Sequence, residues 1–186
     1  MSVTRVASRY AKALLGLAVE QGVLNEVHQD MQQLLKVVKE NRDFALLLKS
    51  PIVTADVKAK IINQIFTGSA QDLTLKFYSI ISRKKRENLL ADIAKQFLAI
   101  YNDHEGIQKA VVTTTFPIGD ELRKVFAEAV KEISGKPKVE LVEKIDKDII
   151  GGFVLKVDDR QIDDSLSSKL KSLKLHFLNN QFEKQI

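Results

Sequence analysis

The hydrophobic period of this 186-residue chain changes once, at residues 103–106, and that change limits the folds open to it. Before this point apolar residues recur every three or four positions, which is the spacing of one face of an α-helix. After it, β-branched and apolar residues alternate with polar ones in short segments, which is typical of strands. We therefore expect two domains, one helical over residues 1–105 and one mixed over residues 106–186.

The first 105 residues divide into six amphipathic segments separated by residues that end helices. Gly22 supplies a left-handed helix cap, Gly68 ends another segment, and Ser50-Pro51 ends a third, because proline disfavours helix at the residue before it. Short helices of this kind must bury their apolar stripes against one another. The expected fold of this part is a six-helix bundle.

The residues after 105 follow the order strand, helix, strand, strand, helix. The strands are expected over 108–116, around Val139 and Leu141, and over 149–157, with a helix from Asp120 to Gly135 between the first two. The final helix carries a narrow seam at 4-3-4 spacing. Its members are Leu166, Leu170, Leu173 and Phe177. The predicted class is α+β, a six-helix bundle followed by a small α/β domain.

Composition excludes several functional classes. The chain has no cysteine, so disulfides and thiolate chemistry are excluded. No apolar run approaches the roughly 20 residues that span a bilayer. Up to residue 105 there are 15 Lys and Arg against 11 Asp and Glu, and afterwards 14 against 13. Neither half has the dense basic stripe of a dedicated nucleic-acid-binding protein.

The C-terminal aspartates and glycines do not fit a metal or phosphate site. A calcium loop counted from Asp158 needs glycine at its sixth position and glutamate at its twelfth, but these are Asp163 and Lys169. Aspartates at these places fit a turn and a helix N-terminus. Gly151-Gly152 opens a strand, where glycine permits close backbone approach, and it lacks the remaining residues of a phosphate-binding loop.

No constellation of catalytic residues is visible. His28, His104 and His176 do not fall at the spacing of a known metal-binding or catalytic motif, and no serine lies in a local hydrolase signature. We predict no catalytic, cofactor-binding or metal-binding residue and no enzymatic activity of the chain alone. The expected role is binding to other macromolecules.

Two apolar patches are candidates for binding a partner helix. The first combines the first and fifth helices and comprises Tyr10, Ala13, Leu14, Leu17, Phe77, Ile80 and Ile81. The second is the seam of the final helix. For the first patch the alternative is that all seven side chains belong to the core, and for the second that the seam packs on its own sheet. The basic run 83–86 has two interpretations. It is either the contact site of a helical adaptor that binds nucleic acid or a solvated link between two helices.

The combined pattern resembles the delta subunit of F-type ATP synthases, whose mitochondrial counterpart is the oligomycin-sensitivity-conferring protein. The resemblance covers nearly the whole chain. It rests on Arg9-Tyr10-Ala11-x-Ala13-Leu14, Ser50-Pro51, Gly151-Gly152-Phe153, Ile162-Asp163, Ser165-Leu166, Leu170 and Leu173. Asp158 and Asp164 depart from it, because many relatives have glycine at these places; aspartate tolerates such turns.

The resemblance implies a non-catalytic subunit of the peripheral stalk of the proton-translocating ATP synthase. It implies that the N-terminal bundle holds the N-terminal helix of an alpha subunit of the catalytic head, with Tyr10, Leu14, Phe77 and Ile81 lining the groove. It also implies that the C-terminal domain meets the b subunits, so that the head resists rotor torque. ATP synthesis and hydrogen ion transport then belong to the complex. The chain is expected at the cytoplasmic face of a bacterial plasma membrane, attached only through the complex, with no cofactor or nucleic acid.

Overall fold

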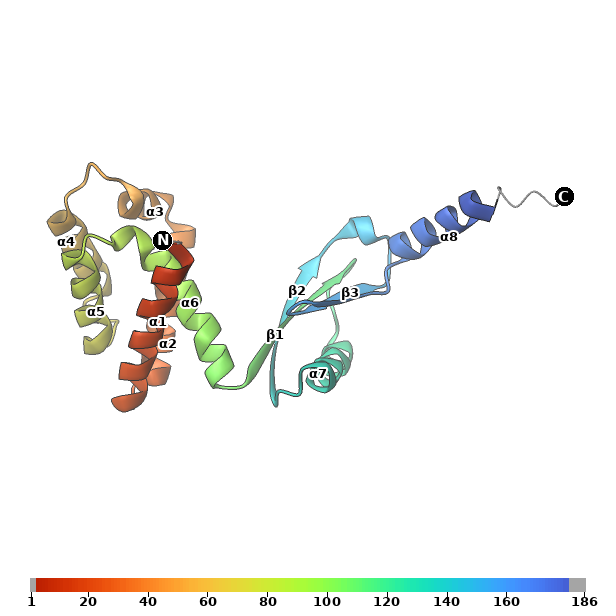
Figure 1. Ribbon diagram of the computed structural model, residues 1–186, viewed down its shortest axis with the longest axis horizontal. Coiled ribbons are helices and arrows are strands. Elements are labelled where there is room, and N and C mark those ends of the chain that lie inside the picture. Colours follow the sequence, from red (N-terminus) through yellow and green to blue (C-terminus); the bar gives the residue numbers. More distant parts are fainter. Residues whose placement is uncertain (1–2, 181–186) are drawn as a thin grey trace. The chain divides into compact units, whose positions relative to one another are not determined.

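The computed structural model describes residues 3–180, with side chains to residue 178 (Figure 1). The chain divides between Tyr101 and Asn102 into two compact units, which we call the N-terminal and C-terminal units. The sequence placed the boundary four residues later, after residue 105. The division falls in the last turn of a helix that ends at His104. The helical spacing of the sequence therefore continues for a few residues beyond the division.

The N-terminal unit consists of helices, and the predicted bundle is confirmed. A short 3₁₀ turn, η1, over Glu87–Leu89 precedes the last of them. The six helices are α1 (Val3–Glu20), α2 (Leu24–Glu40), α3 (Arg42–Lys49), α4 (Ala55–Phe66), α5 (Asp72–Arg83) and α6 (Leu90–His104). All six helices contribute buried apolar side chains, so each helix takes part in the core of the unit.

The first helix meets this core through a stripe of mostly small residues. Its wholly buried positions are Ala7, Ala11, Leu14 and Ala18. Of the four patch residues predicted on this helix, Tyr10, Ala13, Leu14 and Leu17, only Leu14 belongs to the buried stripe, which lies about one residue further around the helix. Alanine lets two helix backbones approach closely, whereas the larger side chains lie at the margins of the contact.

Two buried charged side chains fix helix ends within the N-terminal unit. Asp30 of α2 accepts hydrogen bonds from the Thr74 hydroxyl at 2.6 Å and from the Gln71 amide at 3.0 Å, at the start of α5. Lys58 of α4 donates to the carbonyls of Leu48 at 3.1 Å and Ser50 at 2.7 Å, at the end of α3. An anion at a helix N-terminus and a cation at a C-terminus both complement the helix dipole, so these contacts fix how the helices join.

The C-terminal unit is a mixed sheet with one helix packed on it. Its order is β2-β1-β3-β4, with β1 and β2 parallel and the other pairs antiparallel. The elements are β1 (Ile107–Thr114), α7 (Asp120–Ser134), β2 (Lys138–Ile145), η2 (Lys147–Ile149), β3 (Phe153–Val157), β4 (Arg160–Asp163) and α8 (Leu166–Asn180). A core that includes Val112, Phe126 and Leu155 lies between α7 and the sheet.

The sheet differs from the predicted one in two respects. The strand expected over 149–157 begins only at Phe153, because Ile150 and Gly152 have positive φ and interrupt the extended backbone. A fourth strand, β4, pairs with β3 across a turn at Asp158 and Asp159. The turn was predicted, but the strand after it was not, since all four of its residues are exposed and leave no alternating pattern.

Candidate partner-binding surfaces

An aromatic contact joins the first and fifth helices in the N-terminal unit. The Tyr10 ring of α1 packs edge-on against the Phe77 ring of α5, with centroids 6.5 Å apart. Arg86, just beyond α5, donates a hydrogen bond to the Tyr10 hydroxyl at 3.0 Å and lies 5.8 Å from the centre of its ring. These contacts place the two helices of the first predicted patch side by side.

The seven residues of this patch divide into a buried and an exposed group. Leu14 and Ile81 are wholly buried and Phe77 is nearly so, which corrects the expectation that they line an open groove. They face the core because they lie on the inner stripes of α1 and α5. Leu17 and Ile80 remain 45% and 49% exposed, Ala13 is exposed and Tyr10 is half-buried. We call these last four residues the α1/α5 surface.

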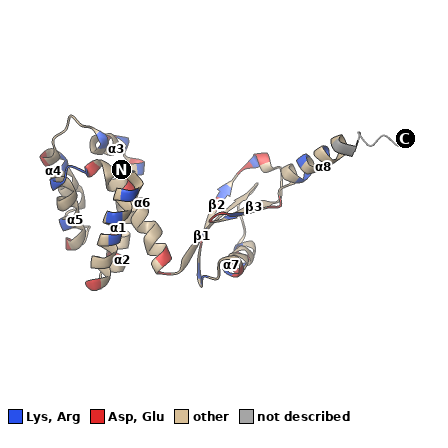
Figure 2. Ribbon diagram, in the orientation of Figure 1, with Lys and Arg blue, Asp and Glu red and all other residues tan. Residues whose placement is uncertain are grey.

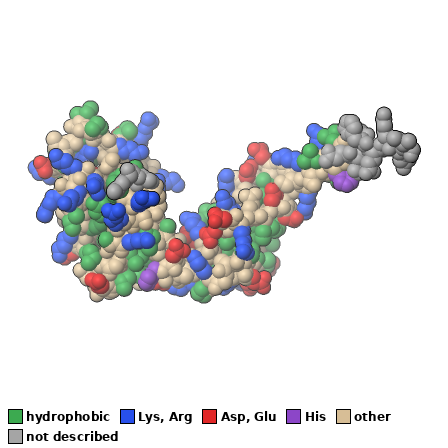
Figure 3. Space-filling model, viewed as in Figure 1, with side chains coloured by type: hydrophobic (Ala, Val, Ile, Leu, Met, Phe, Trp, Pro, Cys, Tyr) green, Lys and Arg blue, Asp and Glu red, His purple; other side chains and the backbone are tan. Residues whose placement is uncertain are grey.

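The last helix presents its apolar seam to solvent. Leu170, Leu173 and Phe177 are 56%, 55% and 64% exposed, and Leu166 is similarly open. Figure 1 shows α8 running away from the sheet, and Figure 3 shows apolar side chains on its visible surface. The alternative that the seam packs on its own sheet is therefore wrong for this structure. We call Leu166, Leu170, Leu173 and Phe177 the α8 seam.

The base of α8 is held by the paired glycines. The Leu166 amide donates to the Gly151 carbonyl at 3.0 Å. Gly152 has φ +78°, and a Cβ there would lie 2.3 Å from the backbone oxygen of Asp164. The predicted close backbone approach at this pair is thus confirmed. No other residue type fits there without a shift of the chain.

Ser165 caps the same helix and is itself held by Asp163. The Asp163 carboxylate accepts hydrogen bonds from the Ser165 amide at 3.0 Å and from the Ser168 hydroxyl at 2.7 Å, and Ser165 in turn accepts from the Ser168 amide at 3.2 Å. These hydrogen bonds hold the pKa of Asp163 below its ordinary value of 3.8. The predicted role of Asp163 at a helix N-terminus is confirmed. The cap and the glycine pair together set the direction in which α8 leaves the sheet.

An apolar cleft in the C-terminal unit was not predicted. It has a volume of about 380 Å³ and lies between α7 and the sheet near β3 and β4. Phe116, Leu122, Val125 and Ile162 line it and are 46–62% exposed. Leu122 and Val125 are the two of these residues that lie on α7. Their exposure follows from their position on α7, where only Phe126 and Val130 are buried.

The described residues contain no cluster that fits a metal ion and no helix that fits a membrane span. Among the described side chains, no group of three or more His, Asp or Glu is placed to hold a metal ion. His28 stacks on Tyr101, with ring centroids 3.9 Å apart. The helices of residues 3–180 include none long and apolar enough to cross a membrane.

The basic run 83–86 lies at the end of α5 and in the turn before η1, and all four side chains are exposed. Figure 2 shows Lys and Arg over several helices of the N-terminal unit, so this run is one part of a broadly basic surface. Arg86 is already engaged with Tyr10 of α1. The run is therefore a solvated link that also connects two helices.

Comparisons with known proteins agree on one family. Residues 6–177 match the family model described as ATP synthase delta (OSCP) subunit. The chain is 41% identical over 186 residues to ATP synthase subunit delta of Cytophaga hutchinsonii, covering all of this chain and 98% of that protein. It is 38% identical over 173 residues to the protein of the same name from Amoebophilus asiaticus, covering 93% and 94%.

The fold is similar to that of a chain in a cryo-EM structure of the Toxoplasma gondii mitochondrial ATP synthase hexamer. The TM-score is 0.73 at 21% identity, and the match covers 92% of this chain and 97% of that one. At this identity the likeness concerns the fold alone. Nothing in these similarities supports the nucleic-acid adaptor that the basic run suggested.

Proposed function

Because the chain belongs to the ATP synthase delta (OSCP) subunit family, and is therefore a component of the peripheral stalk of ATP synthase, we propose that it joins the stalk to the catalytic head through two separate helical surfaces. The observation that carries this proposal is the exposure of apolar side chains on helices in both units. Such surfaces are typical of sites that bind another helix.

In the N-terminal unit the α1/α5 surface binds the N-terminal helix of an alpha subunit. Leu17 and Ile80 offer apolar contact, and the half-buried Tyr10 ring packs against Phe77 at the same pair of helices. Leu14, Phe77 and Ile81 are buried below this surface. They hold α1 and α5 in place and make no direct contact with the partner. This assignment keeps the predicted patch and restricts its contact residues to those that a partner can reach.

The test is the affinity for a peptide with the sequence of the alpha-subunit N-terminal helix. Leu17→Asp and Ile80→Asp each place a charge in the interface and should weaken binding at least tenfold, because a buried unpaired charge is costly. Leu46→Asp on α3 is a matched control, since Leu46 is 55% exposed and lies off this surface. Equal affinity of all three variants, with unchanged helical content, would remove Leu17 and Ile80 from the site.

In the C-terminal unit the α8 seam binds the b subunits. Its 4-3-4 spacing produces a narrow apolar strip of the width that one partner helix covers. The apolar cleft between α7 and the sheet lies in the same unit and offers additional apolar contact. A charge-poor contact of this kind resists dissociation under load better than exposed ion pairs do.

Binding to a soluble fragment of the b subunits tests this second contact. Leu170→Asp and Leu173→Asp should each weaken it at least tenfold. Leu175→Asp is the control, because Leu175 is 60% exposed on the same helix and, at about 100° per residue, lies on the opposite side from the seam. If Leu175→Asp weakens binding as much as the seam variants, the seam is not the site.

The mechanism that follows is mechanical. Torque from the rotor tends to turn the head, and a fixed linkage from the head to the membrane-anchored stalk opposes that motion. The chain itself contributes positions and contact area, with no reaction step of its own. We propose that in a bacterial cell the chain lies at the cytoplasmic face of the plasma membrane, held there by the complex, and that ATP synthesis is an activity of the whole complex.

A further inference from the structure

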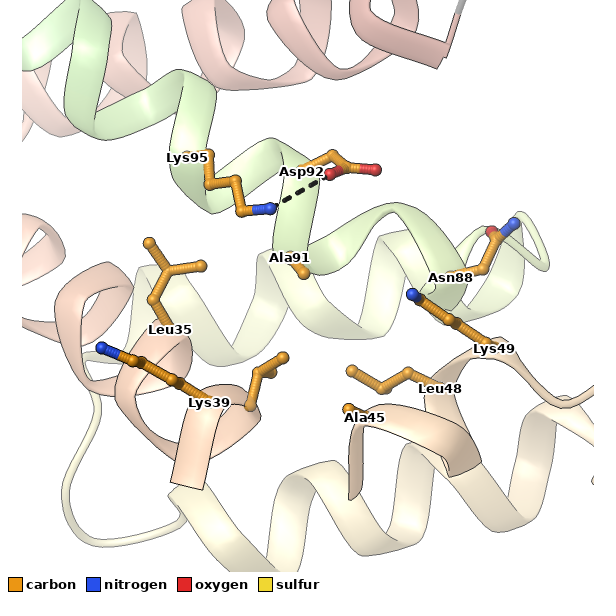
Figure 4. Close-up of a pocket in the computed structure, with 10 residues that line it drawn as sticks. Leu35, Lys39, Ala45, Leu48, Lys49, Asn88, Ala91, Asp92 and Lys95 are labelled. Carbon is orange, nitrogen blue, oxygen red and sulfur yellow. Dashed lines mark ion pairs between the residues drawn. The ribbon is translucent and has the colours of Figure 1, made fainter. Parts of the chain in front are cut away.

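A cavity of about 470 Å³ lies in the N-terminal unit between α2, α3 and the start of α6, away from the α1/α5 surface. Its wall is apolar and comes from Leu35, Val38, Ala45, Leu48 and Ala91. In Figure 4 Leu48 and Ala91 point into the space between the three helices. A cavity of this size falls in the range that small-molecule ligands occupy.

The rim of this cavity is positively charged. Lys39, Lys49 and Lys95 contribute three ammonium groups against the single carboxylate of Asp92. Figure 4 places Lys49 beside Asn88 at one end and Lys39 on the other side. The alkyl stems of such lysines extend an apolar wall while their charged ends stay in water. The site therefore combines an apolar interior with a rim that attracts anions.

The lysines of the rim are available to a ligand. Within the described part of the chain, neither Lys39 nor Lys49 forms a salt bridge. Lys95 pairs only with Asp92, at 3.8 Å and with both side chains exposed, and such a pair contributes little. A carboxylate at the rim would thus gain partners without displacing a strong internal contact.

The shape favours a small ligand over a partner helix. The lining takes little more than one turn from α2 and from α3 and about two turns from η1 and the start of α6, and these close the space on three sides. A docked helix would need a longer open groove with anchors over at least two of its own turns. We propose that this cavity binds a single-chain anionic amphiphile of the fatty-acid class, with its alkyl tail against Leu35, Leu48 and Ala91 and its carboxylate among Lys39, Lys49 and Lys95.

The test uses the full-length chain and dodecanoate below its critical micelle concentration, with binding followed by calorimetry and by amide chemical shifts. Dodecanoate should bind saturably at one site and shift the amides of Leu35, Ala45 and Ala91. Dodecyltrimethylammonium has an alkyl tail of nearly the same length and the opposite charge, and it should bind at least tenfold more weakly. Preferential shifts at the α8 seam, or equal binding of the two amphiphiles, would overturn the proposal.

Two variants examine the two halves of the site separately. Ala91→Phe fills the cavity and should weaken dodecanoate binding at least tenfold. The double variant Lys39→Glu/Lys49→Glu reverses the rim charge and should weaken it about three- to tenfold, whereas Lys36→Glu/Lys60→Glu, with the same net charge on exposed positions outside the lining, should not. Equal weakening in both double variants would show general electrostatic attraction and contradict a site. Preferential binding of an acidic helical peptide over dodecanoate would also contradict it.

Discussion

The first and last helices of this chain both carry apolar residues at helical spacing, yet the structure uses them in opposite ways. α1 buries four side chains completely, three of them alanines, against the bundle. α8 exposes every large apolar side chain described on it, and only its first turn is fixed, by Gly151, Gly152 and Asp163. Apolar spacing therefore shows that a helix face needs a cover, but it does not show whether the cover is the chain itself or a partner.

The largest expected effect is the difference in stability loss when a leucine is truncated to alanine in α1 and in α8. Leu14→Ala should lower the free energy of unfolding of the N-terminal unit by about 2–5 kcal/mol, because it leaves a cavity in a closed core. Leu173→Ala should change the stability of the C-terminal unit by no more than about 0.5 kcal/mol in the isolated chain, since the side chain is 55% exposed. Urea titration followed by NMR measures both.

If Leu173→Ala cost as much as Leu14→Ala, α8 would be packed within its own unit in solution, and the contrast between the helices would disappear.

A smaller effect is expected at the base of α8. Gly152→Ala should destabilise the C-terminal unit by about 2–4 kcal/mol, from a left-handed backbone and a clash with the Asp164 carbonyl. Gly135→Ala is the matched control: its φ is +69°, but no atom lies within 4 Å of the added Cβ, so only the backbone cost of about 1–2 kcal/mol remains. Thermal unfolding measures the difference. Equal costs would mean that the backbone at residues 151–166 separates freely and that α8 has no fixed direction.

The smallest effect concerns the cap of α8. Because the folded pKa of Asp163 is lower than its ordinary 3.8, the cap stabilises the helix above that pH and the contribution is lost as the pH falls through the folded pKa. Ser168→Ala removes one donor and should raise the pKa of Asp163 toward 3.8, while Ser167→Ala should leave it in place. Carboxyl titration by NMR measures this. An unchanged pKa in Ser168→Ala would exclude the hydroxyl as a partner of Asp163.

The sequence predicted the elements more accurately than their faces. Helical spacing identified all six N-terminal helices, but it favoured large apolar residues such as Leu17 and gave little weight to Ala7 and Ala11, which are wholly buried. β4 was missed because four exposed residues carry no alternation, and the strand before it was drawn too long because positive φ at Ile150 leaves no signature in its residue type.

The binding surfaces were predicted only in part, because spacing along the sequence does not show which side of a helix is buried. The spacing identified the residues of the α8 seam, and the structure shows that the sheet of the same unit does not cover them. On α1 and α5, spacing brought together the right helices but could not separate Leu14 from Leu17, because burial depends on the rotation of α1 against its neighbours. The cleft beside α7 depends on which side of that helix the sheet covers, and no local pattern contains that information.

The central claim, that the two units bind different partners independently, is tested most directly by a crossed binding measurement. Leu17→Asp/Ile80→Asp and Leu170→Asp/Leu173→Asp are each titrated with the alpha-subunit peptide and with the soluble b fragment. We predict that the first variant loses at least tenfold in affinity for the peptide alone and the second for the b fragment alone. A folded variant that loses both partners, or both variants retaining both, would contradict the account.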